Sequence, residues 1–155
     1  MLISSTLCYI ESRGKYLMLF RNKKEADPCE GKWVGIGGKF EAGETADTCV
    51  VREVREETGL VLQNLRPRGV VHFKSNELPD EDMFLYTAEL PDGVSEEEAA
   101  GFDCDEGELE WIPKEEVGDL NLWEGDIYFL EKLAADEDGI EMTCIYEGDR
   151  LVEVK

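Results

Sequence analysis

Three glutamates near the end of one predicted helix are the residues of this sequence best suited to chemistry. Glu53, Glu56 and Glu57 stand at i, i+3 and i+4, which puts them on one side of an α-helix. At the negative end of the helix dipole each charge costs about 0.3–1 kcal/mol, and like charges at i and i+4 also repel. A bound cation would remove this cost, and an all-oxygen cluster suits Mg²⁺ or Mn²⁺ better than zinc. The competing interpretation is a solvated acidic face.

A glycine-containing loop and a group of basic residues precede this helix. The glycines, which let a backbone come close to a ligand, are Gly35, Gly37, Gly38 and Gly43. The densest basic patch of the chain consists of Arg21, Lys23, Lys24, Lys32 and Lys39. We interpret this patch as a set of phosphate or base contacts, with a solvated loop as the competing interpretation. Beside a metal-binding helix, the loop predicts a site for a metal and a phosphate.

The stretch from Gly38 to Leu60 resembles the signature of a known enzyme family. Gly38, Glu44 and the run REVREETGL at 52–60 occupy every fixed position of the Nudix box at its spacing. Nudix hydrolases cleave a nucleoside diphosphate linked to another group, and they use a divalent metal and a helix that carries the glutamates. The resemblance implies the family's α+β fold, an α/β/α sandwich with a mixed β-sheet flanked by helices.

The resemblance also implies a role for each residue of the box. The expected metal ligands are the carboxylates of Glu53, Glu56 and Glu57 and the carbonyl of Gly38. Arg52 would orient a glutamate through a charge-assisted bond, and Glu44 would brace the loop or reach the metal through water. Glu56 is the predicted general base, with Glu53 and Arg52 beside it, although spacing does not separate a base from a metal ligand. The expected cofactor is Mg²⁺, with Mn²⁺ as a substitute.

Residues around the box complete the expected site. Gly37 belongs to the loop, and Gly59 is expected to end the helix in the left-handed conformation. In many family members another acid from a later loop joins the metal site, and Glu106 is the candidate here. The competing candidates are its neighbours Asp105 and Glu108.

Two segments outside the box resemble the MutT-type diphosphatases of oxidised purine nucleoside triphosphates. They are GKWVGIGGK at 31–39 and LWEGDIYFLEKL at 122–133. By this resemblance Trp123 would stack on the base and Asp126 would hydrogen-bond the purine, while Trp33 forms either core or pocket wall. Two departures weaken the expected selectivity for 8-oxoguanine. Gly125 replaces one of two adjacent acids, and Val34 replaces an asparagine that contacts the base.

The expected reaction converts a nucleoside triphosphate, such as 8-oxo-dGTP, to monophosphate and pyrophosphate. Markers of family members that act on ADP-ribose or dinucleoside polyphosphates, a proline or a tyrosine after the box, are missing from Ser75-Asn76-Glu77-Leu78. Two alternatives stay open. One is another nucleoside diphosphate substrate of these kinds, and the other is a non-catalytic domain that binds a nucleotide.

The elements that position these residues follow from apolar periodicity and turn residues. Strands are expected at 2–10, 16–21, 69–75, 83–90 and 109–112, a hairpin at 140–154, and helices at 45–58 and 121–135. Thr45 is the expected N-cap of the first helix. This order predicts one domain over residues 1–155, with helices on the faces of a mixed sheet.

Composition limits the partners and the compartment. The net charge of −21, from 37 acidic and 16 basic residues, excludes binding of long nucleic acid or an anionic membrane through a general basic face. Five cysteines without a CxxC pair, and no signal peptide or apolar span, predict a cytoplasmic protein with free thiols. A monomer or homodimer that acts on a small nucleotide is expected.

His72, the only histidine, is expected in a structural role, or at the base if it faces the pocket.

Overall fold

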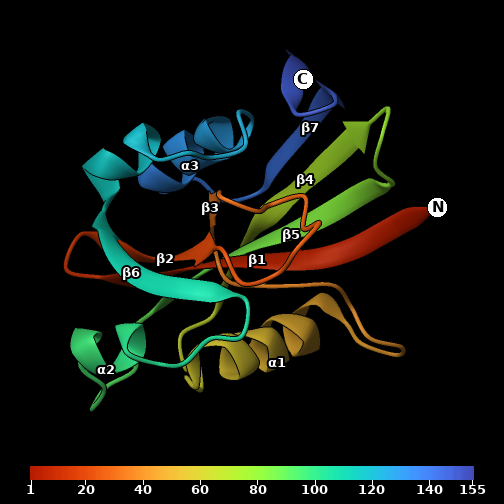
Figure 1. The fold of residues 1–155 in the computed structure, drawn as a ribbon. Helices are drawn as coiled ribbons and strands as arrows, with labels where there is room; N and C mark the ends of the chain where they lie inside the picture. Colours follow the sequence, from red (N-terminus) through yellow and green to blue (C-terminus); the bar gives the residue numbers. More distant parts are fainter.

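The structure, a computed structural model that describes residues 1–155, is built on an eight-stranded mixed sheet (Figure 1). The strands are β1 (Leu2–Ser12), β2 (Lys15–Arg21), β3 (Trp33–Val34), β4 (Arg66–Ser75), β5 (Asp80–Glu89), β6 (Gly107–Pro113), β7 (Ile140–Glu147) and β8 (Arg150–Val154). Their order is β3-β2-β1-β5-β4-β7-β8, with β6 paired to β2. The β1–β5 and β4–β7 pairs are parallel and the other pairs are antiparallel. The predicted mixed sheet is therefore confirmed.

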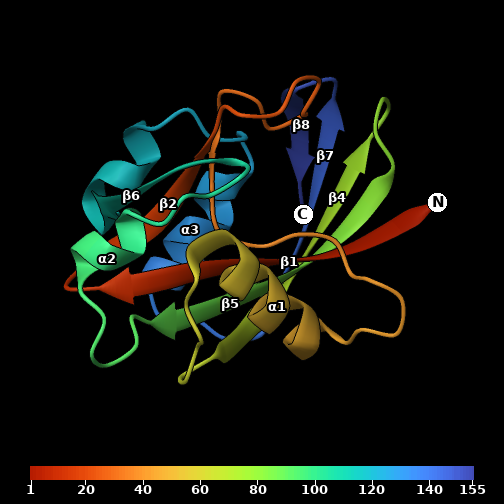
Figure 2. The same ribbon diagram turned by 60° about the horizontal axis from the view of Figure 1, so that its bottom comes forward.

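Helices cover both faces of this sheet. They are α1 (Ala46–Thr58), α2 (Glu96–Ala100) and α3 (Asp126–Ala134), with a 3₁₀ helix at Lys114–Asp119. Figures 1 and 2 show α1 and α3 on opposite faces of the sheet. Side chains alternate along β1, so that Cys8 and Ile10 pack in the core beneath α1 while Leu7 and Tyr9 pack toward α3. The result is the α/β/α sandwich that the sequence predicted. No helix is long and apolar enough to cross a membrane.

Both ends of α1 are determined by local sequence. Thr45 and Thr48 form a reciprocal capping box, in which each side chain accepts a hydrogen bond from the other residue's backbone N–H. Gly59 ends the helix at φ 74°, and a Cβ there would lie 2.8 Å from the ring of Phe102. The helix buries Val50 and Val54 against the sheet. The predicted helix, its cap and its stop are all present.

Three elements differ from the sequence prediction, and the first is β3, a two-residue strand that was not expected. The helix expected from residue 121 begins only at Asp126, because the preceding segment pairs with the loop before β3. There the carbonyl of Asn121 accepts from the N–H of Trp33, and its side chain donates to the carbonyl of Gly31. The acidic segment expected to be a loop contains α2, which is capped by the side chain of Ser95.

Candidate active site

Glu57 is the most buried of the three box glutamates, with 4% of its surface exposed. Its Oε2 accepts a hydrogen bond from the backbone N–H of Gly37 at 3.0 Å, and its buried Oε1 has no hydrogen-bond partner. Burial, followed by the neighbouring carboxylates of Glu106 and Glu53, raises the pKa of Glu57 well above its ordinary value. A buried carboxylate oxygen without a partner is costly, so this atom is suited to a cation.

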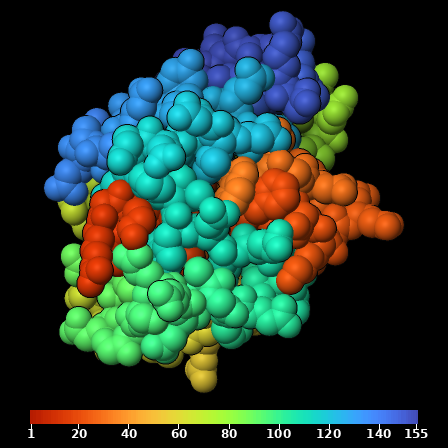
Figure 3. All heavy atoms as spheres, turned by 60° about the vertical axis from the view of Figure 1, so that its left-hand side comes forward, coloured from red at the N-terminus to blue at the C-terminus, as the bar shows by residue number.

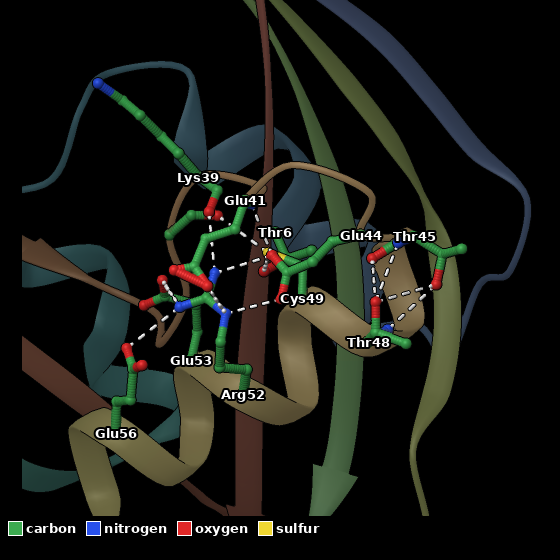
Figure 4. Close-up of polar contacts among 11 residues, drawn as sticks. Thr6, Lys39, Glu41, Glu44, Thr45, Thr48, Cys49, Arg52, Glu53 and Glu56 are labelled. Atoms are coloured by element: carbon green, nitrogen blue, oxygen red, sulfur yellow. Dashed lines mark hydrogen bonds and ion pairs between the residues drawn. The ribbon is translucent and has the colours of Figure 1, made fainter.

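Arg52 is the centre of a network that joins the helix to the preceding loop (Figure 4). Its Nε and Nη2 donate to the two carboxylate oxygens of Glu44 at 2.7 and 2.9 Å, and Nη2 also donates to the carbonyl of Lys39. Its Nη1 donates to Glu53 at 2.8 Å and to Glu56 at 3.1 Å. The hydrogen bonds from Arg52 to Glu44, followed by one from the backbone N–H of Glu41, lower the pKa of Glu44 to about 2. Arg52 therefore holds the loop in place and partly neutralises the negative charges of Glu53 and Glu56.

Glu53 lies directly under the glycine loop. A Cβ on Gly38 would lie 2.6 Å from the carboxyl carbon of Glu53, so only glycine allows this close approach. Burial is the main reason that the pKa of Glu53 is raised, against the lowering effect of Arg52. The carbonyl of Gly38, the predicted fourth metal ligand, accepts hydrogen bonds from the N–H of Thr6 at 2.9 Å and, more weakly, from the thiol of Cys49 at 3.5 Å.

Glu106 reaches the site from the segment before β6, as the sequence predicted for an acid from a later loop. It forms ion pairs with Arg21 at 3.1 Å and Lys24 at 2.8 Å. Burial opposes its ionisation, but its interactions with Glu57, Lys24 and Arg21 outweigh burial and lower its pKa to about 2. Figure 3 shows the orange 20–30 loop against the green-to-teal segment that carries Glu106. The competing candidates point elsewhere: Asp105 is exposed, and Glu108 pairs with Asn22.

The carboxylates of the site are ligands of the kind that a hard divalent cation binds. Glu57 has a buried oxygen without a partner, the carboxylates of Glu53 and Glu106 are near enough to raise its pKa, and oxygen ligands are those that Mg²⁺ prefers. The acids do not converge into a closed coordination group. Arg52 holds Glu53 and Glu56, while Arg21 and Lys24 hold Glu106. Binding of a cation therefore requires these ion pairs to change partners.

Glu53, Glu56 and Glu106 line a cavity of about 710 Å³, which is large enough for a small ligand. Site residues on its wall are Gly37, Gly38, Lys39, Arg52, Glu53, Glu56, Lys24 and Glu106 at one end, and Trp123 and Asp126 at the other. Figure 4 shows the side chain of Lys39 extending away from the carboxylates. Lys39 and Lys32 are the two residues of the predicted basic patch that form no ion pair, and of these only Lys39 lines the cavity, so it is available there for an anion.

Trp123 and Asp126 lie at the aromatic end of the cavity. The indole of Trp123 packs edge-on against Phe73 and Tyr146 with ring centres 5.7 and 5.1 Å apart, and the amine of Lys32 lies 5.2 Å above it. Asp126 is 8% exposed, and its carboxylate forms no hydrogen bond or ion pair within the chain. Burial raises its pKa to about 7, and the distant charge of Lys32 opposes that shift only in part.

Two predicted substrate contacts, and the histidine, do not line the cavity. Trp33 stacks on Phe20 with ring centres 5.1 Å apart, because β3 turns its side chain toward the core beside α3. The amine of Lys23 is held by the carbonyl of Cys104 at 2.7 Å. His72 bonds to Asp82 and Glu141 at 2.6 and 3.1 Å, on the sheet face away from the cavity. For His72 the structural role that we expected fits this position.

The sequence prediction missed most of the cavity floor. It is formed by side chains of β1, β5, β4 and β7 that share one sheet face, among them Ser5, Glu81, Phe73 and Tyr146. Alternation along each strand shows which residues of one strand face the same way. It does not show which face covers the cavity, because that depends on where the helices pack.

Comparison with known proteins agrees with this geometry. Residues 1–133 match the family model of the NUDIX domain. The Nudix hydrolase YvcI of Bacillus subtilis is 29% identical over 91% of this chain and 85% of its own. The oxidized purine nucleoside triphosphate hydrolase of Mus musculus is 29% identical over 66% of this chain and 63% of its own.

Solved structures agree in the same way. The MutT protein of Bacillus halodurans superimposes with a TM-score of 0.83 at 26% identity, over 99% of this chain and 96% of that one. That chain and this one therefore share their fold over nearly their full lengths. Together with the family match over residues 1–133, this shows that the chain belongs to the Nudix hydrolase family.

Proposed function

We propose that this protein is a Mg²⁺-dependent pyrophosphohydrolase of nucleoside triphosphates, with oxidised purine nucleotides as the favoured class. It would release the monophosphate and pyrophosphate, and so remove damaged nucleotides from the cytoplasmic pool. The observation that carries this proposal is one cavity with a carboxylate cluster at one end and Trp123 with Asp126 at the other. A nucleotide has the same two ends, with phosphates that need cations and a base that stacks.

At the phosphate end, the residues of the chain have separate tasks. A divalent metal, when bound by Glu53, Glu56, Glu57 and Glu106, would neutralise phosphate oxygens and acidify a bound water. Glu56 is the most exposed of the helix glutamates, with 59% of its side chain accessible, and we assign it as the general base. Arg52 pairs with both glutamates, but Glu53 is closer, at 2.8 against 3.1 Å, and only 14% of its side chain is exposed, which suits a fixed ligand better than a group that must move a proton. Lys39 would contact a phosphate.

At the base end, the contacts fit a purine. The indole of Trp123 provides a stacking face on the cavity wall, and base–aromatic stacking contributes about 1–3 kcal/mol. The carboxyl of Asp126 has a pKa of about 7, so near neutral pH it can accept or donate a hydrogen bond at the base edge. Val34, which also lines the cavity, offers no polar contact. Asp126 would therefore carry most of the polar recognition of the base.

The experiment is a substrate panel. Purified protein with Mg²⁺ is incubated with normal and oxidised nucleoside triphosphates, ADP-ribose, NAD and dinucleoside polyphosphates, and the products are identified by chromatography. We expect pyrophosphate and monophosphate, with the highest kcat/KM for an oxidised purine. Faster cleavage of ADP-ribose, NAD or a dinucleoside polyphosphate would replace this proposal with another Nudix activity.

Matched variants keep the panel interpretable. Glu56→Gln should lower turnover by about 10²–10⁴-fold, whereas Glu110→Gln should leave turnover unchanged, because Glu110 is exposed on β6 and forms no hydrogen bond or ion pair. Binding of nucleotide without turnover of any compound in the panel would instead indicate a non-catalytic domain.

A further inference from the structure

One acidic side chain on the cavity floor has no part in the proposed metal or base contacts. Glu81 lies on β5, opposite Ile3 of β1 and Phe73 of β4 in the sheet register. Its neighbour on the same face of β5 is Met83. A carboxylate among apolar neighbours needs polar partners, so its presence on this floor calls for an explanation.

The contacts of Glu81 leave half of its carboxylate free. The hydroxyl of Ser5, a residue that is 4% exposed, donates to Oε2 at 2.6 Å. Oε1 forms no hydrogen bond, and no basic side chain forms an ion pair with Glu81. Ser5 therefore holds the carboxylate in one orientation while an acceptor oxygen stays available on the cavity floor. A carboxylate can only accept, so its partner must be a hydrogen-bond donor.

The position of Glu81 identifies which part of a nucleotide it meets. The segment 36–40, which carries Gly38 and Lys39, pairs with β1 through the Ser5–Lys39 bridge. Neighbouring strands are about 4.8 Å apart, so β5 lies roughly 10 Å from this segment. On the far side, Trp123 packs on Phe73 of β4, the next strand after β5. Glu81 thus lies between the phosphate end and the base end, where a nucleotide has its sugar.

We propose that Glu81, held by Ser5, is a specificity-determining residue that accepts a hydrogen bond from the 2′-hydroxyl of the nucleotide sugar. The inference rests on the proposed nucleotide substrate. Ribonucleotides are then preferred, because a deoxyribonucleotide brings no donor to this oxygen and still displaces water from it. Loss of one hydrogen bond to a charged group corresponds to roughly a tenfold difference in affinity or more.

The first test uses binding, so that it does not depend on turnover. Calorimetry measures the dissociation constants of GMP and dGMP for the wild type, Glu81→Met and Ser5→Ala. We expect about tenfold tighter binding of GMP by the wild type. The preference should disappear in Glu81→Met, which keeps the length of the side chain without an acceptor. It should be reduced in Ser5→Ala, in which the carboxylate loses its fixed orientation. Equal affinities in the wild type, or a preference unchanged in Glu81→Met, overturn the inference.

The second test uses a matched control on the same cavity. Asp126→Asn should change the preference between bases and leave the ratio of kcat/KM for GTP and dGTP as in the wild type. Glu81→Met should lower that ratio toward one and leave the order of bases unchanged. If Asp126→Asn changes the ratio of kcat/KM for GTP and dGTP and Glu81→Met does not, Glu81 is not the residue that contacts the sugar. Failure of the wild type to hydrolyse any nucleotide, with GMP still preferred over dGMP in binding, counts against the proposed reaction and supports the sugar contact.

Discussion

The two ends of the cavity are built in different ways. The carboxylate end comes mostly from one continuous stretch, in which the glycine loop lies over the side chains of α1. The aromatic end combines β4, β7 and the segment before α3, with Phe73, Tyr146 and Trp123 in contact. The carboxylate end is also held by ion pairs, whereas the carboxylate of Asp126 at the other end is unpaired. This difference suggests that the first end performs a common reaction and the second selects the substrate.

The largest effect should come from the carboxylate end. Replacement of Glu56 by Gln, which keeps the shape and removes the basic carboxylate, should lower kcat by about 10²–10⁴-fold. The dissociation constant for a nucleoside monophosphate should change little, because the aromatic end is intact. Steady-state kinetics and calorimetry on the same preparation measure both quantities. A parallel loss of binding would mean that the two ends do not act separately.

A smaller effect is expected at Arg52, which orients Glu53 and Glu56. Arg52→Lys keeps the charge and loses the paired hydrogen bonds to Glu44. Activity should fall about 10–100-fold, the usual range for residues that orient metal ligands. The concentration of Mg²⁺ that gives half-maximal activity should rise as well. If Arg52→Lys and the wild type need the same Mg²⁺ concentration for half-maximal activity, Arg52 does not position the metal ligands.

The aromatic end is tested by Trp123→Ala. Loss of stacking should raise KM by about tenfold or more and lower kcat much less, since the stacking contribution is about 1–3 kcal/mol per base. Trp33→Phe is the matched control, because Trp33 lies off the cavity and packs on Phe20. Similar kinetic changes in both tryptophan variants would remove the distinction between cavity wall and core.

The last prediction concerns the effect of Asp126 on stability, from which we expect the smallest change in activity. Burial raises the folded-state pKa from 3.8 to about 7, so between these values the folded protein keeps a proton that the unfolded chain has lost. The Asp126 contribution to stability is therefore present below pH 3.8 and is lost as pH rises toward 7. The slope is at most about 1.4 kcal/mol per pH unit. Asp126→Asn should raise the melting temperature relative to wild type more at pH 8 than at pH 4, as measured by calorimetry. An equal difference at both pH values would contradict the raised pKa.

The sequence could predict what is built from one continuous stretch, as at the carboxylate end, better than what distant segments build together. Glu53, Glu56 and Glu57 share a helix side because of a local period, and Thr45 and Gly59 mark its ends, so the helix follows from neighbouring residues. The start of α3 at Asp126 depends instead on Asn121 contacting the loop before β3, which no local pattern contains.

The floor residues were missed for a related reason. Ser5 and Glu81 are 76 positions apart and meet only through the parallel register of β1 and β5. A parallel register between distant strands is not encoded by a turn, so a single sequence does not reveal it. The structure places Glu106 in the site, where Lys24 and Arg21 hold it near Glu57, and its role as a metal ligand stays a prediction.

The central claim is that the carboxylate end cleaves a nucleoside triphosphate to pyrophosphate and monophosphate. Phosphorus NMR of an oxidised purine nucleoside triphosphate, incubated with the protein and Mg²⁺ in ¹⁸O-labelled water, tests it most directly. We predict signals of pyrophosphate and monophosphate only, with the label in one product, and a reaction slowed by about 10²–10⁴-fold with Glu56→Gln. Release of inorganic phosphate and a nucleoside diphosphate, or an unchanged triphosphate in the presence of the wild type, would contradict the claim.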